Sequence, residues 1–349
     1  MSTPPVRTSR KHGRVYSIAL LCLLLVGIGG IAIAIGSVKI PFGTTFAILL
    51  DKLPLVDLTP TWPNGLTTIV LEIRLPRVIL AGLVGAALAT AGATYQGLFR
   101  NPLADPYLIG VAQGASLGAV AGFLLPSSRV GPQIVPLLAF AGALGATAIV
   151  YSLARVGKTL PMTTLILAGV AVGALLGSIV SFLIINSGDR LHGIIFWLMG
   201  SFSLSKWSEV RLVLPYLIAG MALLILYARP LNIMQLDEEQ AQQLGINVEQ
   251  LKLVLLAAAT LITAAAVSFV GTIGFVGILI PHAVRLLWGP DYRFLLPLSV
   301  LAGAIFLIAA DLLARTIAAP EEIPIGVITA LCGAPFFLYL LRRKKRVLF

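Results

Sequence analysis

The stretch YSIALLCLLLVGIGGIAIAIGSV, residues 16–38, has 23 consecutive positions without a charged side chain. A helix rises about 1.5 Å per residue, so about 20 apolar residues cross the roughly 30 Å hydrocarbon core of a bilayer. Backbone groups in lipid must be hydrogen-bonded internally, and a helix does this within one segment. The stretch therefore predicts a transmembrane helix.

A basic start precedes this stretch, as it does in a signal peptide. The apolar run is too long for the core of such a peptide, and no clear small-x-small cleavage site follows it. We therefore interpret 16–38 as a retained first span and 1–15 as a cytoplasmic N-terminal tail.

The rest of the chain is similarly apolar. Of its 349 residues, 58% are hydrophobic and 11% are charged, against roughly 25% charged in a soluble domain. The mean hydropathy is +0.99. Short segments of alternating polarity, typical of barrel strands, do not occur, so we expect an all-α integral membrane protein. The apolar windows predict ten transmembrane helices, at 16–38, 66–99, 107–125, 133–156, 162–185, 209–228, 249–270, 275–288, 293–315 and 323–341. These form one domain, 16–341, followed by a basic tail, 342–349.

Positive charge predicts the orientation of these spans. With both termini in the cytoplasm, cytoplasmic segments hold 16 of the 25 Lys and Arg residues and external segments hold nine. Such an excess is typical of the cytoplasmic side. The net charge of +11 is spread singly or gathered at the termini, which favours membrane topology over nucleic-acid binding. The segment 229–248, between spans six and seven, is then cytoplasmic.

This segment leads into the most polar part of the chain outside the termini, LDEEQAQQLGINVEQ, residues 236–250. Asp237, Glu238 and Glu239 favour the first turn of a helix, where the dipole is positive. Gly245 predicts its end. The result is a short cytoplasmic helix, which the sequence leaves open as either a solvated connector or a docking element.

Catalytic and metal-binding patterns are missing from the sequence. Cys22 and Cys332 lie in apolar runs and suggest neither a disulfide nor a metal site. The GKT at 157–159 lacks the first glycine and the preceding strand of a nucleotide-binding loop, so we interpret it as a chance match. The charges within the spans gather at predicted helix ends, which disfavours an ion-coupled transporter working alone.

Glycines recur every four residues in two predicted helices, at 110, 114, 118 and 122 and at 169, 173 and 177. Such stripes favour close packing of helix backbones, although they could also line a pathway. Outside the membrane, we expect a loop with a short helix at 39–66. We also expect a half-helix at 194–199, which is apolar but too short to span.

Several strings, in order along the chain, resemble a known family. They are RLPR (74–77), VGAALATAG (84–92), NPLADPYLIGVAQGA (101–115), LILAGVAVG (165–173), FWLMGSFS (196–203), GTIGFVGILIPHAVRL (271–286) and IPIGVITALCGAPFFLYLL (323–341). From about residue 16 to the C-terminus, the chain is similar to FecCD-type permeases. These are the membrane subunits of ABC importers for ferric siderophores, haem and vitamin B12.

The resemblance implies a type II ABC importer permease fold of ten helices, in a homodimer within the cell membrane. It implies two separate ATPase subunits that bind ATP and Mg, and an extracytoplasmic protein that delivers a large metal chelate. The chain itself would then be no enzyme and hold no cofactor. The segment 231–248, within the cytoplasmic segment 229–248, would be the coupling helix that enters the ATPase. Its coupling residues would be Leu236, Asp237, Glu238, Glu239, Ala241, Leu244 and Gly245.

The resemblance also implies two further sets of site residues. Arg74, Arg77 and Arg315 match positions on the outer face that receive acidic residues of the binding protein, and three exposed cations could steer such a partner. Alternatively, Arg315 pairs with Asp311 and the other two with Glu72.

The second set forms the cytoplasmic gate: Asn101, Leu103, Pro161 and Met162. Pro161 and Met162 stand where the vitamin B12 importer has small hydroxyl residues, which leaves the chelate undetermined. Two alternatives to import remain in view: an ion-coupled secondary transporter that works alone, and a membrane-embedded enzyme.

Overall fold

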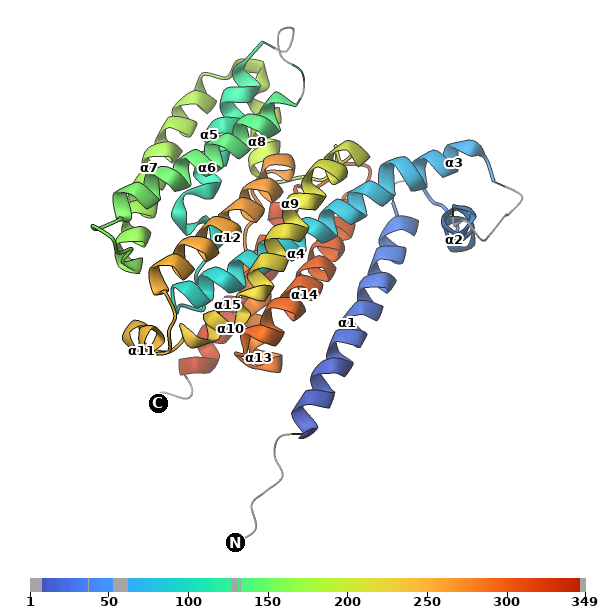
Figure 1. Cartoon of the computed structure of the whole chain (residues 1–349). Helices are drawn as coiled ribbons and strands as arrows, with labels where there is room; N and C mark the ends of the chain where they lie inside the picture. Colours follow the sequence, from blue (N-terminus) through green and yellow to red (C-terminus); the bar gives the residue numbers. More distant parts are fainter. Residues whose placement is uncertain (1–7, 37, 53–61, 127–130, 132, 346–349) are drawn as a thin grey trace.

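The computed structural model describes residues 8–36, 38–52, 62–126, 131 and 133–345. Within these ranges, side chains are described from residue 16 onward, except at 340, 341 and 343–345. This part of the chain is a bundle of helices, with a single isolated bridge between Val156 and Thr159 (Figure 1). The longer helices are α1 (Thr8–Ala34), α4 (Leu75–Leu98), α5 (Val111–Leu124), α6 (Ile134–Ala154), α7 (Met162–Ile185), α9 (Trp207–Leu226), α12 (Val248–Val270), α13 (Val276–Trp288), α14 (Tyr292–Ala314) and α15 (Ile325–Lys345).

Shorter elements connect them. These are α2 (Phe42–Asp51), α3 (Asn64–Thr68), the π-helix η1 (Ile69–Arg74), the 3-10 helices η2 (Pro106–Ile109) and η3 (Gly188–Arg190), α8 (Leu191–Leu198), α10 (Ala228–Ile233) and α11 (Glu238–Gln243). The expected short helix in the first external loop is α2, and the expected half-helix is α8. Part of that first loop, 53–61, lies outside the described residues.

Each predicted span coincides with one of the longer helices. Within the described part of the chain, seven helices are long and apolar enough to cross a membrane. The apolar helices at three predicted spans are shorter: α5, α13 and the segment Ile325–Tyr339 of α15. The all-helical membrane class is therefore confirmed, whereas the count of ten spans stays a prediction.

Helix α4 lies at the centre of the bundle, where 20 of its 24 residues are buried. It packs against α9, α12, α13 and α14. Two glycines let its neighbours approach: a Cβ on Gly85 would lie 2.2 Å from the carbonyl oxygen of Gly303, and one on Gly92 would lie 1.8 Å from that of Gly277. Larger side chains at these two positions would push the helices apart.

Helices α5, α6 and α7 pack as a group beside this centre (Figure 1). The first glycine stripe confirms the packing prediction, since added Cβ atoms at Gly114 and Gly118 would lie 2.3 and 1.9 Å from carbonyl oxygens of α6. In the second stripe only Gly169 makes such an approach, 2.1 Å from the carbonyl oxygen of Leu108. Gly177 has open space beside it within this chain, so the packing prediction for this part of the stripe stays a prediction.

The chain unwinds between α12 and α13. Gly271 has φ +77° and Phe275 has φ +69°, in the left-handed region that stops a helix. The Tyr107 hydroxyl pairs with the non-helical backbone here, donating to the Ile273 carbonyl at 3.0 Å and accepting from its N–H at 3.1 Å. Non-helical backbone inside a membrane protein needs such partners, and the turn leaves α13 too short to match the other spans.

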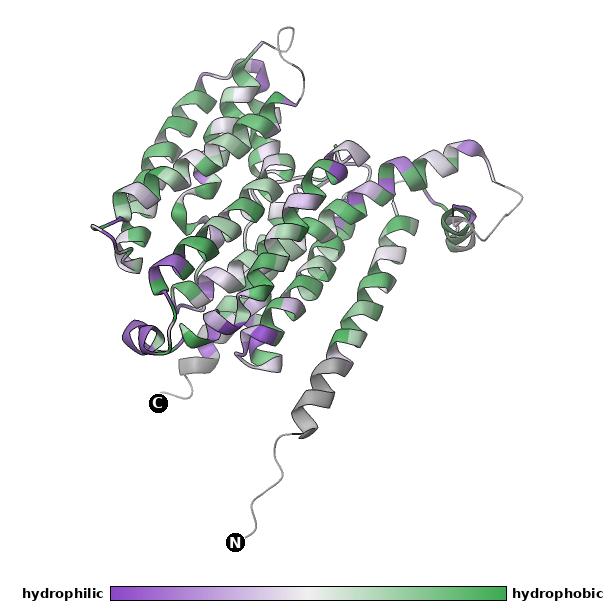
Figure 2. Cartoon of the chain, viewed as in Figure 1, coloured by the Kyte–Doolittle hydropathy of each residue, from purple (hydrophilic) through white to green (hydrophobic). Residues whose placement is uncertain are grey.

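Polar residues gather at the two ends of the bundle, while its middle is apolar (Figure 2). Helix α11 lies at the same end as the start of α1 and the end of α15 (Figure 1). The start of α4 lies at the other end, about 35 Å away by the rise of a 24-residue helix. The predicted coupling and gate residues lie at the end that holds α11, and the predicted docking arginines lie at the end where α4 starts.

Candidate functional site

The polar segment forms the short helix that the sequence predicts. Asp237 is the N-cap of α11, and Glu238 and Glu239 occupy its first turn. Gly245 has φ +83°, and the Ile246 N–H returns to the Ala241 carbonyl at 3.1 Å. This is a Schellman ending, in which a glycine lets the chain leave the helix.

The outer surface of this segment carries apolar side chains as well as charge. Leu244 is 61% exposed and Leu236 46%, and Glu239 is exposed beside them. Ala241 is fully buried, so among the predicted coupling residues it packs α11 onto the bundle. Exposed leucines on so polar a segment are a surface that a partner can cover.

Beneath α11, Lys252 of α12 forms what we term the lysine junction, with Glu238, Glu249 and the backbone of Leu160. The Lys252 side chain is 2% exposed. Its Nζ donates to Glu238 Oε2 at 2.8 Å, to Glu249 Oε1 at 2.9 Å and to the Leu160 carbonyl at 3.2 Å. The other Glu249 oxygen accepts from the Leu160 N–H at 2.8 Å. The three N–H bonds of the ammonium are thus all used.

The predicted gate residues flank the polar segment. Leu160 directly precedes Pro161 and Met162, both of which are half-buried. On the other side, the Arg100 Nε donates to the Met234 carbonyl at 2.9 Å, and Arg100 Nη1 lies 3.4 Å from Asp237.

Asn101 and Leu103, the other two gate residues, are exposed in the loop after α4, and the Asn101 side chain accepts from the Leu103 N–H at 2.9 Å. Both gate loops therefore contact the polar segment or its junction. The gating role of these residues stays a prediction.

Asp105, whose carboxyl is partly buried, lies at the end of the loop that holds Asn101. Asp105 caps η2 by accepting from the Tyr107 N–H at 2.7 Å. Burial raises the pKa of Asp105 to about 6, and the hydrogen bond from Tyr107 only partly offsets this. The carboxyl is therefore close to its titration range near neutral pH.

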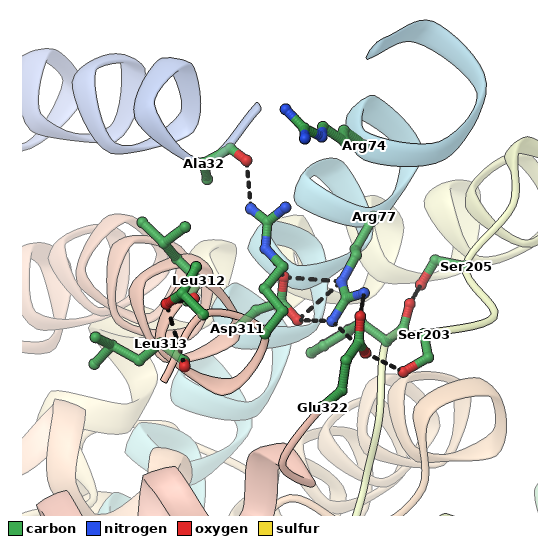
Figure 3. A network of polar contacts seen from close by, with 12 residues as sticks. Ala32, Arg74, Arg77, Ser203, Ser205, Asp311, Leu312, Leu313 and Glu322 are labelled. Atoms are coloured by element: carbon green, nitrogen blue, oxygen red, sulfur yellow. Dashed lines mark hydrogen bonds and ion pairs between the residues drawn. The ribbon is translucent and has the colours of Figure 1, made fainter. Parts of the chain in front are cut away.

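At the other end of the bundle, Arg77 is the centre of what we term the arginine network (Figure 3). Its Nη2 lies 2.9 Å from Asp311 and its Nη1 lies 2.8 Å from Glu322. The Ser203 hydroxyl donates to Glu322 as well. Burial raises the pKa of Glu322, but the bonds from Arg77 and Ser203 outweigh it, and the pKa is lowered overall.

Arg74 and Arg315, the other two members of the network, hold the end of α1. Arg74 Nη1 donates to the carbonyls of Ile33 at 2.9 Å and Ala34 at 2.6 Å, and Arg315 donates to that of Ala32. The last carbonyls of a helix lack partners within it and carry the negative end of its dipole, so cations bind well there. These arginines fasten α1 to the end of η1, where α4 begins, and to the end of α14.

The structure thus corrects the expected exposure of the three arginines, all of which are buried. Within the described residues, the predicted pairing of Arg315 with Asp311 is confirmed at 3.5 Å. The predicted pairing of Arg74 and Arg77 with Glu72 is wrong. Arg77 pairs with Asp311 and Glu322, and Arg74 donates to the backbone carbonyls at the end of α1, while Glu72 is exposed. Sequence analysis missed Glu322, Glu249 and Lys252 as site residues.

Comparison with known proteins places this geometry in context. The profile of the FecCD transport family matches residues 21–343. A cobalamin import system permease protein of Halobacterium salinarum is 47% identical over 328 residues, which cover 89% of this chain and 88% of that protein. A hemin transport system permease protein of Yersinia pestis is 44% identical over 285 residues, covering 79% and 83%.

Among solved structures, one described as an inward-facing conformation of a metal-chelate type ABC transporter is similar with a TM-score of 0.80. Its sequence is 31% identical, and the match covers 93% of this chain and 98% of that one.

Proposed function

The chain belongs to the FecCD transport family, and on that premise we propose that it is the permease subunit of an ATP-driven importer for a metal chelate. The observation that carries the proposal is the segment around α11. It is a polar helix at one end of an apolar bundle, with exposed Leu236 and Leu244 on its outer surface. Two loops that hold the proposed gate contact it from within.

In this proposal, two copies of the chain form the pathway and span the cell membrane ten times each, with both termini in the cytoplasm. Two ATPase subunits dock on the two α11 segments and bind ATP and Mg. Their closure draws the segments together and shifts the population between inward-open and outward-open states, which is possible only if ATP binds one state better. Asn101, Leu103, Pro161 and Met162 close the cytoplasmic side.

We propose a macrocyclic or siderophore-type metal chelate as cargo. Support comes from the relatives, of which one is named for cobalamin and another for hemin. Because cobalamin and hemin differ in size and charge, these relatives support metal chelates as the cargo class and do not single out one of the two.

We propose that the binding protein docks at Arg74, Arg77 and Arg315, and that docking breaks contacts that these arginines make within the chain. Each arginine already has partners within the chain, so an incoming carboxylate must displace one of them. The bond from Arg77 to Glu322 is the most accessible, because Glu322 is only half-buried. Docking at this end would then exchange one acidic partner for another.

The experiment that tests the function is uptake into proteoliposomes. They hold the permease with its ATPase, and the binding protein is added outside with cobalamin, haemin or a ferric siderophore. We expect uptake of one of these chelates that requires ATP, the ATPase and the binding protein together. The isolated chain should hydrolyse no ATP. Uptake by the chain alone, driven by a proton or sodium gradient, would instead establish a secondary transporter.

A further inference from the structure

Lys252 occupies an unusual position for a cation. It lies in the second turn of α12, its side chain is buried, and it reaches groups from three separate segments: α11, the first turn of α12 and the loop before α7. A buried ammonium is costly unless its donors are all satisfied. Here each donor has a different acceptor, so moving any one segment changes the environment of the charge.

The contacts to the loop before α7 are made through its backbone. Leu160 donates its N–H to Glu249 and its carbonyl accepts from Lys252, so both polar groups of the residue before Pro161 are held. The carboxylate of Glu249 in turn binds Lys252 with its other oxygen. The position of the loop is therefore set by the same ammonium that binds α11.

On the α11 side the link is a single side chain. Glu238 binds Lys252 at 2.8 Å and is itself 43% exposed. Its neighbour Glu239 is exposed and makes no hydrogen bond or ion pair within the described part of the chain. Glu238 therefore connects α11 to the buried Lys252, whereas Glu239 contributes only surface charge, so variants of the two acids can distinguish these properties.

The junction also has room to rearrange. A cavity of about 280 Å³ lies against it, lined by Arg155, Lys158 and Leu160 from the loop and by Glu249 and Gln250 from α12. Water in this cavity can solvate Glu249 or the Leu160 backbone if the bonds to Lys252 open. Lys252 does not line this cavity, so its ammonium has to keep its protein acceptors as the loop moves, whereas Glu249 and Leu160 can exchange theirs for water.

We infer that Lys252 is a positioning residue that connects the movement of α11 to the gate residues Pro161 and Met162. When a partner shifts α11, Glu238 pulls on Lys252, and Lys252 with Glu249 carries the Leu160 backbone. The inference deepens the proposed function and rests on it for the identity of the partner. The link between α11 and Leu160 itself belongs to this chain alone.

The first test needs no partner. Residue-resolved hydrogen exchange of the purified permease in nanodiscs would follow the Leu160 amide in Lys252→Met, Glu238→Gln, Lys252→Arg and Glu239→Gln variants. Lys252→Met removes the charge-assisted hydrogen bond to the Leu160 carbonyl and the bond that holds Glu249, which accepts from the Leu160 N–H. Exchange at Leu160 should therefore become about tenfold faster, with a smaller change in Glu238→Gln. Lys252→Arg should retain most of the protection, and Glu239→Gln all of it.

The second test measures coupling in the assembled importer. The readout is chelate imported per ATP hydrolysed, since a merely structural role of Lys252 would lower both rates together. We expect Lys252→Met to lower this ratio about tenfold, on the scale of one charged hydrogen bond, and adding Glu238→Gln to cause little further loss. Protection of amides in the middle of α12 shows that each variant is folded.

The outcomes separate the two proposals. If the wild-type chain shows no ATPase-dependent uptake, the proposed function fails, and hydrogen exchange at Leu160 alone decides the link. If uptake is intact but Lys252→Met leaves both Leu160 exchange and the coupling ratio at wild-type values, the inference is overturned and the function stands. Should Lys252→Met not fold, Glu238→Gln decides, because Glu238 lies at the surface end of the junction.

Discussion

The arginine network and the lysine junction lie at opposite ends of the bundle, and each surrounds a buried cation with two carboxylates. They differ in the exposure of those acids. Asp311, the main partner of Arg77, is 2% exposed, whereas Glu238, which binds Lys252, is 43% exposed. Removing one partner of a fully buried ion pair strongly destabilises the fold, because the other charge is left buried and unpaired. In a half-exposed pair, water or a partner protein can replace the lost contact, so the fold loses less.

The difference also concerns which elements are joined. Asp311 lies in α14 and Arg77 in α4, two long helices that pack together in the core. The lysine junction instead joins a short helix and a loop to the start of α12. We infer that the first cluster fixes the bundle and the second lets a surface helix move a loop.

The largest effect is expected from removing the buried acid of the arginine network. Asp311→Asn leaves Arg77 and Arg315 without their shared carboxylate, which should lower the stability of the fold by about 3–5 kcal/mol. Thermal unfolding of the purified protein in detergent would measure it. Asp189→Asn, at an exposed acid, is the matched control and should change little. Equal shifts for the two variants would contradict a fastening role for the network.

At the end that holds the lysine junction, Asp105 should make the stability of the fold depend on pH. Because the folded state raises the pKa of Asp105 to about 6, ionising it costs stability, and this cost appears as the pH rises from about 4 to about 6. Asp105→Asn removes the charge and keeps an acceptor for the Tyr107 N–H. We expect it to stabilise the fold by about 1–2 kcal/mol at pH 7.5 and by little at pH 4.

Unfolding midpoints at the two pH values would measure this difference. A stabilisation that is the same at pH 4 and pH 7.5 would show that the carboxyl does not titrate between them. Asp237→Asn serves as the control, because Asp237 is a solvent-exposed acid at the same end of the bundle.

A smaller effect is expected at the accessible edge of the arginine network. Glu322→Gln leaves Arg77 paired with Asp311 but frees part of its guanidinium for a carboxylate of the binding protein. Affinity of the binding protein should rise about three- to fivefold at low ionic strength, as for an exposed ion pair, and fall back with added salt. Glu321→Gln, the exposed neighbouring acid, is the control. Unchanged or weaker docking would remove Arg77 from the proposed docking site.

The sequence predicted the elements of this fold better than their contacts. Apolar windows located each long helix, and the acidic turn and Gly245 located α11, because these signals are local. The burial of Arg77 is not a local property. It depends on Asp311 and Glu322, which lie 234 and 245 positions along the chain, and a charge near a helix end is ordinarily solvated.

Lys252 could have been found from a local signal. It lies within an apolar window, where a cation needs a partner, and Glu249 is three positions before it on the same face of a helix. The Leu160 backbone and Glu238 could not have been added, since neither has a sequence pattern that marks a contact. The exposure of Leu244 likewise depends on how α11 packs onto the bundle through Ala241, which is a tertiary contact.

The central claim is that a separate ATPase docks on the α11 segment, and its most direct test is the affinity of the ABC ATPase for the permease in nanodiscs. Leu244→Asp removes an exposed leucine that has no part in the lysine junction, and Leu204→Asp changes one that is 81% exposed beside the arginine network. On the scale of one buried leucine, Leu244→Asp should weaken binding about tenfold or more, and Leu204→Asp should leave it unchanged. Wild-type affinity for Leu244→Asp, or equal losses for the two variants, would contradict the account.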